Sequence, residues 1–288
     1  MKPEPAAKTS TVPKVCVIGW PIKHSRSPLI HSYWLDQFKI SGSYERAEVR
    51  PEEFADFVGN LARNGFVGAN VTLPHKEAAF ALCDIKTDLA ARLEAVNTLW
   101  IEAGKLCGDN SDVAGFLGAL DQDAPGWDVG LERAVILGAG GAARAIIAGL
   151  LLRSVKEIML VNRTEARAEE LAARFGPAVK AHGLADLPDL LGRAGLLVNT
   201  TSLGMTGQPM LDIDLETLPA QAVVNDIVYV PLETGLLHRA RSRGLRVVGG
   251  LGMLLHQAVP GFEHWFGQRP KVSSELRTLI EADVMAKS

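Results

Sequence analysis

The stretch AVILGAGGAARAIIAGLLL, residues 134–152, decides how the second half of the chain is organised. Val135–Leu137 is an apolar run of the kind that forms a buried strand. A glycine-rich turn follows, and a helix is expected from about Ala142 to Leu152. Strand, tight turn and helix therefore succeed one another within 19 residues.

The turn matches the pattern G-x-G-x-x-[G/A], with Gly138, Gly140 and Ala143 in its three small positions. Gly138 permits the tight turn, and Gly140 lets the backbone approach a pyrophosphate. Ala143 is small enough for close packing of helix on strand, and the helix start supplies free N–H groups for an anion. The pattern predicts dinucleotide binding; a glycine turn that serves packing alone is the alternative.

The next strand, in EIMLVNRTEARAEELA (157–172), indicates which dinucleotide is bound. An NAD site usually places Asp or Glu at this strand end to bond the ribose 2′-OH. This strand instead ends in Asn162-Arg163-Thr164, with Arg167 a turn later. Two guanidinium groups suit a 2′-phosphate, which favours NADP over NAD. The alternative makes Thr164 a helix cap and leaves both arginines solvated.

Composition places the chain among ordinary globular proteins. Of its 288 residues 47% are hydrophobic and 22% charged, and 30 basic against 33 acidic residues give a formal charge of −3. We expect no nucleic-acid surface, which needs a clustered basic excess, and no membrane span, because the longest apolar run is Ala145–Leu152. Residues 1–13 are predicted to be a disordered tail without a signal-peptide core. Three widely spaced cysteines argue against a disulfide framework or metal site and favour a reducing cytoplasm.

Apolar runs alternate with helix-period segments along the whole chain, which predicts α/β architecture with parallel sheets. The Pro- and Gly-rich stretch 121–132 suggests a boundary between two α/β domains with a cleft between them. Predicted strands are 15–20, 43–49, 66–73, 95–101, 133–138, 157–162, 196–201, 222–228 and 246–249. Predicted helices are 28–39, 51–64, 76–83, 112–122, 141–153, 165–175, 234–243 and 253–266.

Polar residues cluster where strands of the first half end. Lys76 falls in the first turn of a predicted helix, an unfavourable place for a cation unless it has a function. Asn97 lies in an otherwise apolar strand and needs hydrogen-bond partners, either backbone or a hydroxylated ligand. In the run Asp109–Asp112, Ser111 or Asp112 is suited to cap the following helix. A Lys–Asp pair beside a nicotinamide ring is a plausible proton-transfer device; the alternative is an exposed lysine and a helix cap.

The stretch GWPIKHSRSPLIH (19–31) places Ser25 and Ser27 at a strand-to-helix junction. Ser27 followed by Pro28 predicts a helix N-cap and first-turn proline. A helix N-terminus also favours a carboxylate, so cap and ligand roles are compatible. Ser25 has no structural role visible in the sequence.

Nine motifs, in order, resemble the shikimate dehydrogenase family over roughly residues 14–275. They are Ser25–Pro28, Asn70–Lys76, Ala95–Thr98, Gly108–Asp112, Gly138–Ala142, Asn162–Thr164, Asn199–Met205, Gly250–Leu254 and His256–Ala258. The resemblance implies reversible NADPH-dependent reduction of 3-dehydroshikimate to shikimate, in aromatic amino-acid biosynthesis. It implies an N-terminal open-sheet substrate domain (14–115, completed by helices in 253–288) and a C-terminal Rossmann-type NADP domain (116–252). No membrane or nucleic-acid partner is expected, and the protein is expected to be a monomer or homodimer.

The resemblance also implies roles for individual residues. Lys76 and Asp112 form the catalytic pair, and Ser25 and Ser27 hold the substrate carboxylate. Further substrate contacts are implied for Thr72, Asn97, Tyr229 and Gln257. Cofactor contacts are implied for Gly138, Ala139, Gly140, Gly141, Ala142, Asn162, Arg163, Thr164, Arg167, Thr200, Ser202, Met205, Ile227 and Gly250.

Two alternative functions remain open from the sequence. A quinate/shikimate dehydrogenase that uses NAD would carry an acidic residue at or near Arg163, which this chain lacks. A non-catalytic NADP-binding paralogue would be expected to lose Lys76 or Asp112, and both are present. The family commonly has Thr where this chain has Ser111, and the hydroxyl is retained.

Overall fold

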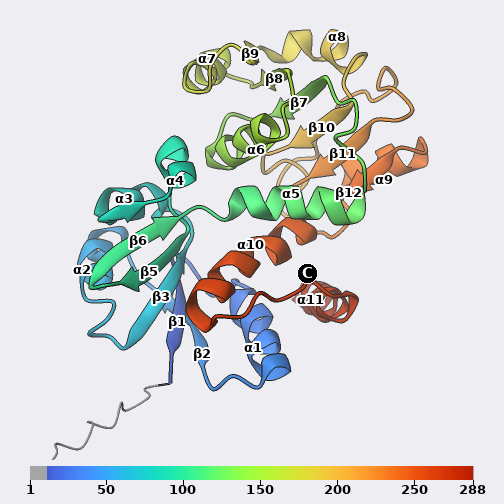
Figure 1. The fold of residues 1–288 in the computed structure, drawn as a ribbon. Helices are drawn as coiled ribbons and strands as arrows, with labels where there is room; N and C mark the ends of the chain where they lie inside the picture. The colour runs from blue at the N-terminus through green and yellow to red at the C-terminus, as the bar shows by residue number, and fades with distance from the viewer. Residues whose placement is uncertain (1–11, 288) are drawn as a thin grey trace, which may run out of the picture. The chain divides into compact units, whose positions relative to one another are not determined.

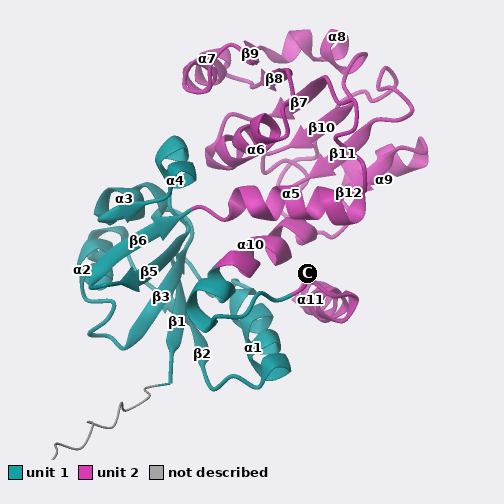
Figure 2. Ribbon diagram, viewed as in Figure 1, with its two compact units in different colours: residues 1–109, 261–270 teal, residues 110–260, 271–288 magenta. Residues whose placement is uncertain are grey.

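The computed structural model describes residues 12–287, which form two compact units (Figures 1 and 2). Unit 1 contains the described residues up to Asp109 together with Gly261–Pro270. Unit 2 contains Asn110–Pro260 and the segment from Lys271 onward. Residues 1–11 of the predicted tail lie outside the described residues.

Unit 1 is built on a six-stranded sheet of order β2-β1-β3-β5-β6-β4 (Figure 1). Its strands are β1 (Lys14–Gly19), β2 (Ser43–Glu48), β3 (Phe66–Val71), β4 (Ile85–Lys86), β5 (Thr98–Glu102) and β6 (Lys105–Asp109). The prediction of a parallel sheet is wrong here, because β5 runs antiparallel to β3 and to β6. A two-residue turn joins β5 to β6, and Ala103 and Gly104 both have positive φ in it, as a type I′ hairpin requires. Strands β4 and β6 were not predicted.

The helices of unit 1 enclose an apolar core on the sheet. They are α1 (Ser27–Phe38), η1 (Pro51–Glu53), α2 (Phe54–Gly59), α3 (Lys76–Leu82) and α4 (Asp88–Leu93), of which α4 was not predicted. The returning segment completes this core from far along the chain: Trp265 is buried and donates its Nε1–H to the Leu99 carbonyl oxygen at 2.9 Å. Gly68 permits this approach, because a Cβ there would collide with the Trp265 indole.

Unit 2 is built on a fully parallel sheet of order β12-β11-β10-β7-β8-β9. Its strands are β7 (Arg133–Leu137), β8 (Glu157–Val161), β9 (Val179–His182), β10 (Leu196–Asn199), β11 (Val223–Asp226) and β12 (Arg246–Val248). Numbered within the unit, this is the order 6-5-4-1-2-3 of dinucleotide-binding folds, and it reverses direction between β7 and β10. The predicted Rossmann-type architecture is confirmed, although β9 was not predicted.

Helices cover the sheet of unit 2. They are α5 (Asp112–Asp123), α6 (Gly141–Leu152), α7 (Glu165–Ala173), η2 (Leu184–Asp186), α8 (Leu187–Leu191), α9 (Gly235–Ser242), α10 (Gly250–Phe266) and α11 (Ser274–Lys287). Helix α10 starts in unit 2 and ends in unit 1. The stretch 121–132 lies inside unit 2, where Trp127 is buried and donates its Nε1–H to Asp121 at 2.9 Å. Elements η2 and α8 were not predicted, and α11 was expected only from the resemblance, as one of the helices within 253–288.

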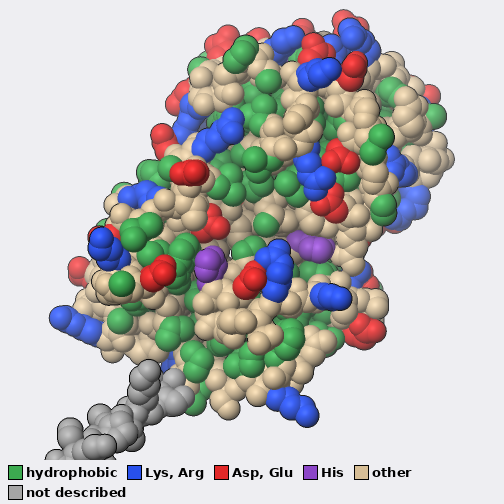
Figure 3. Space-filling model, viewed as in Figure 1, with side chains coloured by type: hydrophobic (Ala, Val, Ile, Leu, Met, Phe, Trp, Pro, Cys, Tyr) green, Lys and Arg blue, Asp and Glu red, His purple; other side chains and the backbone are tan. Residues whose placement is uncertain are grey.

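Charged side chains of both signs are interspersed on the face of the molecule in Figure 3. This agrees with the near balance of acidic and basic residues in the sequence. Among residues 12–287, no helix combines the length and apolar character that crossing a bilayer needs.

His31 of α1 is fully buried among aromatic rings of unit 1, stacked on Tyr44 with ring centroids 4.0 Å apart. Burial lowers the pKa of His31 to about 3, although Asn70 opposes this shift. The unfolded chain takes up a proton at His31 near pH 6.5, whereas the folded chain does not until about pH 3. Acid therefore favours unfolding from about pH 6.5 downward.

We expect His31→Phe to remove this part of the pH dependence. At pH 5 the neutral buried ring costs the native protein about 2 kcal/mol of the stability it has at pH 7. Urea unfolding of both proteins between pH 7 and 5 measures the effect, and the phenylalanine variant should show a shallower decline. Parallel declines would contradict the assignment.

Candidate active site

The carboxyl ends of β1 and β3 and the start of β5 lie at one edge of the unit 1 sheet. Because β5 is antiparallel to β3, Thr98 at its start pairs with Asn70 near the end of β3. Thr98 also pairs with Asp109 at the end of β6. Asn97 directly precedes β5 and is buried, and its backbone N–H donates to the Asp109 carbonyl oxygen at 3.0 Å. Asn70, Asn97, Thr98 and Asp109 are therefore gathered at one edge of this sheet.

The two serines of the first motif differ from the local structural roles that the sequence predicts for them. Helix α1 begins at Ser27 itself, with Arg26 in the N-cap position and no side-chain cap, so the prediction that Ser27 caps the helix is wrong. Ser25 supplies a local bond instead, because its Oγ accepts from the Ser27 N–H at 3.3 Å. Arg46 donates to the Ser25 carbonyl oxygen at 2.6 and 3.1 Å. Ser25 thus has a structural role that the sequence did not reveal.

Lys76 is the first residue of α3, as predicted, and follows a turn that is fastened to several neighbours. The Thr72 N–H donates to the Ile18 carbonyl oxygen at 2.9 Å, and the Val96 N–H donates to the Lys76 carbonyl oxygen at 2.9 Å. His75 is buried and donates its Nε2–H to the Val49 carbonyl oxygen at 2.8 Å. These bonds hold in place the backbone that carries the Lys76 side chain.

Asp112 and Gln257 belong to unit 2 and lie on two closely packed helices. A Cβ at Gly115 of α5 would sit 2.7 Å from the Gln257 Cβ of α10, so glycine permits this approach. Asp112, three residues before Gly115, lies on the same face of α5. Neither Ser111 nor Asp112 caps α5 with its side chain; Asn110 Oδ1 accepts the Asp112 N–H at 3.0 Å instead.

The glycine loop connects β7 to α6 as predicted. Gly138 has a φ of +99°, a conformation that L side chains rarely adopt, and its N–H donates to the Val161 carbonyl oxygen at 2.8 Å. Thr200, which follows β10, donates its hydroxyl to the Leu137 carbonyl oxygen at 2.8 Å. A Cβ at Gly138 would lie 2.9 Å from the Thr200 Oγ1. The loops after β7 and β10 are thus packed together at the point where the strand order reverses.

The helix start beyond this turn fits a pyrophosphate. Gly140 is the N-cap of α6 and gives no side-chain cap. A Cβ at Gly140 or Gly141 would meet nothing within 4 Å, so the space beside these two glycines at the helix start is open. A phosphate there would accept from backbone donors and face the positive end of the helix dipole. Ala139 and Ala142 complete this loop.

The end of β8 is fastened to the glycine loop through Asn162. Its Oδ1 accepts from the Ala139 N–H at 3.3 Å, and its Nδ2 donates to the Thr164 carbonyl oxygen at 2.8 Å. Thr164 occupies the N-cap position of α7 without a side-chain cap bond, so the predicted capping is wrong. Arg163 and Arg167 are exposed beside this loop. Both arginines are therefore accessible to a phosphate near the loop.

Asp226 at the end of β11, a buried carboxylate that the sequence analysis did not single out, fastens the loops that follow β10 and β11. It accepts from Asn199 Nδ2 at 2.9 Å, from the Val228 N–H at 3.1 Å and from the Thr234 hydroxyl at 2.7 Å. Burial raises the pKa of Asp226, while these three bonds oppose the shift. Asn199 Oδ1 accepts in turn from Thr201. The only sign of these bonds in the sequence is the polar residues at the ends of two predicted strands, in NTTS (199–202) and ND (225–226).

The remaining predicted cofactor residues lie on the loops that this carboxylate fastens. Ser202 and Met205 follow β10 and are exposed, and Tyr229 follows β11 and is half-buried. Gly250, the first residue of α10, rests so closely on the Ile227–Val228 backbone that no side chain would fit there. Ile227 and Gly250 are therefore brought together within unit 2.

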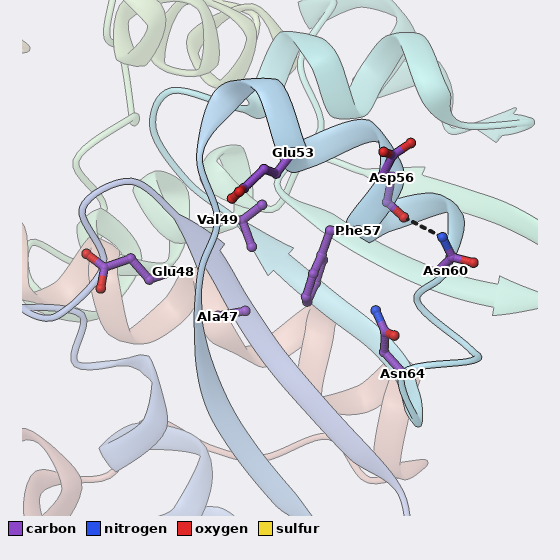
Figure 4. A pocket seen from close by; sticks show the side chains of 8 residues that line it. All are labelled: Ala47, Glu48, Val49, Glu53, Asp56, Phe57, Asn60 and Asn64. Carbon is purple, nitrogen blue, oxygen red and sulfur yellow. Dashed lines mark hydrogen bonds between the residues drawn. The ribbon is translucent and has the colours of Figure 1, made fainter.

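A separate open cavity of about 430 Å³ lies between β2 and α2 in unit 1 (Figure 4). Its lining is Ala47, Glu48, Val49, Glu53, Asp56, Phe57, Asn60 and Asn64. None of the predicted site residues is among them. Within residues 12–287, no group of three or more His, Cys, Asp or Glu side chains is arranged to hold a metal ion.

Three family models match the chain. Residues 17–99 match the shikimate dehydrogenase substrate binding domain, and residues 123–209 match shikimate/quinate 5-dehydrogenase. Residues 250–274 match the shikimate 5′-dehydrogenase C-terminal domain. Together the matched segments cover more than half of the chain.

Curated relatives and solved structures resemble the chain over nearly its full length. A shikimate dehydrogenase (NADP(+)) of Methylocella silvestris is 62% identical, covering 96% of this chain and 98% of that protein. One of Mesorhizobium japonicum is 58% identical, covering 95% and 98%. The structure of quinate dehydrogenase from Corynebacterium glutamicum with NAD has a TM-score of 0.87 at 29% identity, covering 94% and 99%. That of shikimate 5-dehydrogenase from Thermus thermophilus with NADP(H) and shikimate has a TM-score of 0.81 at 34% identity, covering 96% and 100%.

Proposed function

The chain belongs to the shikimate dehydrogenase family, and from that membership we propose the residues through which it acts. It catalyses the reversible NADPH-dependent reduction of 3-dehydroshikimate to shikimate, a step in aromatic amino-acid biosynthesis. The observation that carries this function is the 62% identity to a shikimate dehydrogenase (NADP(+)) over 96% of the chain. The protein is accordingly an oxidoreductase whose cofactor is NADP.

Unit 1 is the proposed substrate-binding part and unit 2 the proposed cofactor-binding part. Support for the first comes from the family model of a substrate binding domain, which matches residues 17–99. Support for the second comes from the parallel sheet of unit 2 and the open helix start at Gly140. Gln257 is the proposed contribution of α10 to substrate binding.

Lys76 is the proposed proton donor in the reducing direction. Bound NADPH supplies the hydride that converts the substrate carbonyl to an alcohol. The Lys76 ammonium would stabilise the negative charge that develops on the carbonyl oxygen and deliver a proton to it. In the oxidising direction the same amine takes the proton back. Its firmly bonded backbone supports this role, because general acids act only when held in reach of the reacting oxygen.

The remaining polar residues are proposed to hold the substrate. Shikimate has one carboxylate and three ring hydroxyls, so it needs donors at one end and mixed partners at the other. Ser25 and Ser27 are proposed for the carboxylate, at the start of α1 where the helix field favours an anion. Asp112, the second member of the catalytic pair, is proposed to orient a ring hydroxyl. Further hydroxyl contacts are proposed for Thr72, Asn97, Tyr229 and Gln257.

Substrate and cofactor choice can be tested together. Initial rates with shikimate and with quinate, each with NADP and with NAD, separate the shikimate enzyme from a quinate enzyme that uses NAD. The fold does not distinguish them, because the quinate dehydrogenase structure is at least as similar as the shikimate dehydrogenase one. We expect the shikimate–NADP pair to be fastest. Equal or faster turnover of quinate with NAD would overturn both assignments.

We expect the double variant Arg163→Ala/Arg167→Ala to raise the KM for NADP about tenfold or more, because a charge-assisted pair with the 2′-phosphate is lost. NAD has no 2′-phosphate, so its KM should stay within about twofold. Steady-state rates with both cofactors measure this. Arg174→Ala, at the other end of α7, is the control. A parallel rise for both cofactors would place the 2′-phosphate elsewhere.

Cytoplasmic location and a monomeric or homodimeric state are also proposed. Cys16, Cys83 and Cys107 are free thiols buried in unit 1, which suits a reducing compartment. Sedimentation equilibrium of the purified chain tests the oligomeric state.

A further inference from the structure

A series of buried hydrogen bonds runs through unit 1 from Tyr44 to Asn97, and Ser27 lies beside Tyr44 at the start of the series. We propose that Tyr44 is a positioning residue that orients both Ser27 and Asn97 for substrate binding. The inference rests on the proposed roles of Ser27 and Asn97. Tyr44 itself lies on β2, whereas Ser27 begins α1 and Asn97 precedes β5, so the series joins three separate elements.

The central link is between Tyr44 and Asn70. The Tyr44 hydroxyl donates to Asn70 Oδ1 at 2.6 Å. Asn70 Nδ2 donates to the Asn97 carbonyl oxygen at 3.0 Å and to Thr98 Oγ1 at 3.3 Å. Both ends of the Asn70 amide are therefore engaged, and reversing the amide would turn its oxygen toward the Asn97 carbonyl oxygen, which can only accept.

The far end of the series fixes Asn97. The Thr98 hydroxyl accepts from Asn70 and donates its own proton to Asn97 Oδ1 at 3.0 Å. Because Oδ1 is the acceptor in this bond, the orientation of the Asn97 amide is determined. Asn97 is thus held twice, by its carbonyl oxygen through Asn70 and by its side chain through Thr98.

The near end of the series meets Ser27, whose side chain lies close enough to the Tyr44 hydroxyl to oppose the rise of the Tyr44 pKa. Since the single proton of Tyr44 goes to Asn70, the Tyr44 oxygen faces Ser27 as an acceptor. The donors from Tyr44 through Asn70 and Thr98 to Asn97 all point the same way. Bonds aligned in this manner polarise and strengthen one another.

Burial makes the series rigid. Tyr44, Asn70, Asn97 and Thr98 are each no more than 6% exposed. The Tyr44 ring is stacked on His31 at a centroid distance of 4.0 Å with an angle of 3° between the rings. Burial, with a smaller effect of Cys16, raises the pKa of Tyr44 well above its ordinary value against the opposing effect of Ser27. Tyr44 therefore stays a phenol, and its proton remains available to Asn70.

The test begins with Tyr44→Phe, which removes one oxygen and keeps the ring that stacks on His31. We expect the KM for shikimate to rise about fivefold to tenfold, because Ser27 loses its acceptor and Asn70 its donor. The KM for NADP should stay within about twofold. Tyr33→Phe, which removes a phenol from α1 in the same unit, is the matched control and should leave both constants unchanged.

A coupling measurement separates positioning from general loosening of the fold. Ser27→Ala and Asn97→Ala are combined with and without Tyr44→Phe, and shikimate binding to each full-length protein is measured by calorimetry. We expect the two alanine effects to be non-additive when Tyr44 is present and additive when it is phenylalanine. A purely structural tyrosine would leave the additivity the same in both backgrounds.

Thr98→Val breaks the series at its other end with almost no change in volume, and covers the case in which Tyr44→Phe fails to fold. It should also raise the KM for shikimate and spare that for NADP. If both variants keep the KM for shikimate within twofold while the two alanine variants raise it, the inference is overturned and the binding-site assignment stands. If Ser27→Ala and Asn97→Ala also leave the KM for shikimate unchanged, both the Tyr44 inference and the binding-site assignment are overturned.

Discussion

We expect Lys76→Met to lower kcat about 10²–10⁴-fold, because a positioned general acid contributes a factor of that size. Methionine keeps an unbranched apolar side chain of similar reach and removes the ammonium group with its charge and protons. The hydrogen bonds around residue 76 that involve its backbone persist, because the Val96 N–H donates to the carbonyl oxygen. Steady-state rates in both directions, with NADP or NADPH, measure the effect.

Two controls make the Lys76 result interpretable. Lys105→Met removes an exposed lysine from the β5–β6 hairpin of the same unit and should leave kcat unchanged. Shikimate affinity of Lys76→Met, measured by calorimetry, shows whether the substrate still binds. A variant that binds shikimate and retains kcat within about threefold of the native enzyme would exclude lysine as the acid.

Gly140→Asp should abolish cofactor binding without harming the fold. Gly140 has φ −94° and ψ −172°, an extended conformation that any residue adopts, and a Cβ there meets nothing within 4 Å. Aspartate is also a good N-cap, so the free energy of unfolding should stay within about 0.5 kcal/mol or rise slightly. The carboxylate would occupy the helix N–H groups and repel a pyrophosphate. We expect the Kd for NADP to rise about 100-fold or more.

The measurements are NADP titration by calorimetry and urea unfolding of the same preparations. Gly140→Asn is the matched control, because it can cap the helix with a side chain of the same size that carries no charge. Its Kd for NADP should rise less than that of the aspartate variant. Native affinity in Gly140→Asp would show that the pyrophosphate does not lie at this helix start.

The pattern of the sequence predicted most of unit 2. The β7–α6 motif is local, and its strand, positive-φ glycine and helix start all follow from neighbouring residues. The parallel sheet followed from alternation of strand and helix. Strand β9, only four residues long, was missed because its polar residues give little hydrophobic signal.

Unit 1 was harder to predict because its decisive pairing is not local. Parallel and antiparallel strands have the same apolar pattern, and the β5–β6 turn places Ala103 in a left-handed conformation that alanine rarely adopts. The predicted strand 95–101 includes Asn97, whereas β5 begins at Thr98, so Asn97 lies just before the strand and beside Asn70.

Candidate side chains were predictable by type, whereas their partners were not. Serine before proline predicts a cap, but Ser27 is already helical and its side chain lies beside Tyr44, 17 residues away in sequence. The sequence likewise gave no sign that Asn162 fastens Ala139 or that Asp226 accepts three bonds. Such partners depend on tertiary packing, which spacing along the chain does not contain.

The late return of α10 into unit 1 has a consequence for biosynthesis. Trp265 fills the place that Gly68 leaves open, and Phe262 stacks near His31, yet both emerge from the ribosome more than 150 residues after Asp109. Nascent unit 1 therefore lacks Phe262 and Trp265 in its core until residues 110–260 of unit 2 have been translated. The aromatic core of unit 1 can therefore be completed only after every strand of the unit 2 sheet has been synthesised, although the strands of unit 1 are encoded first.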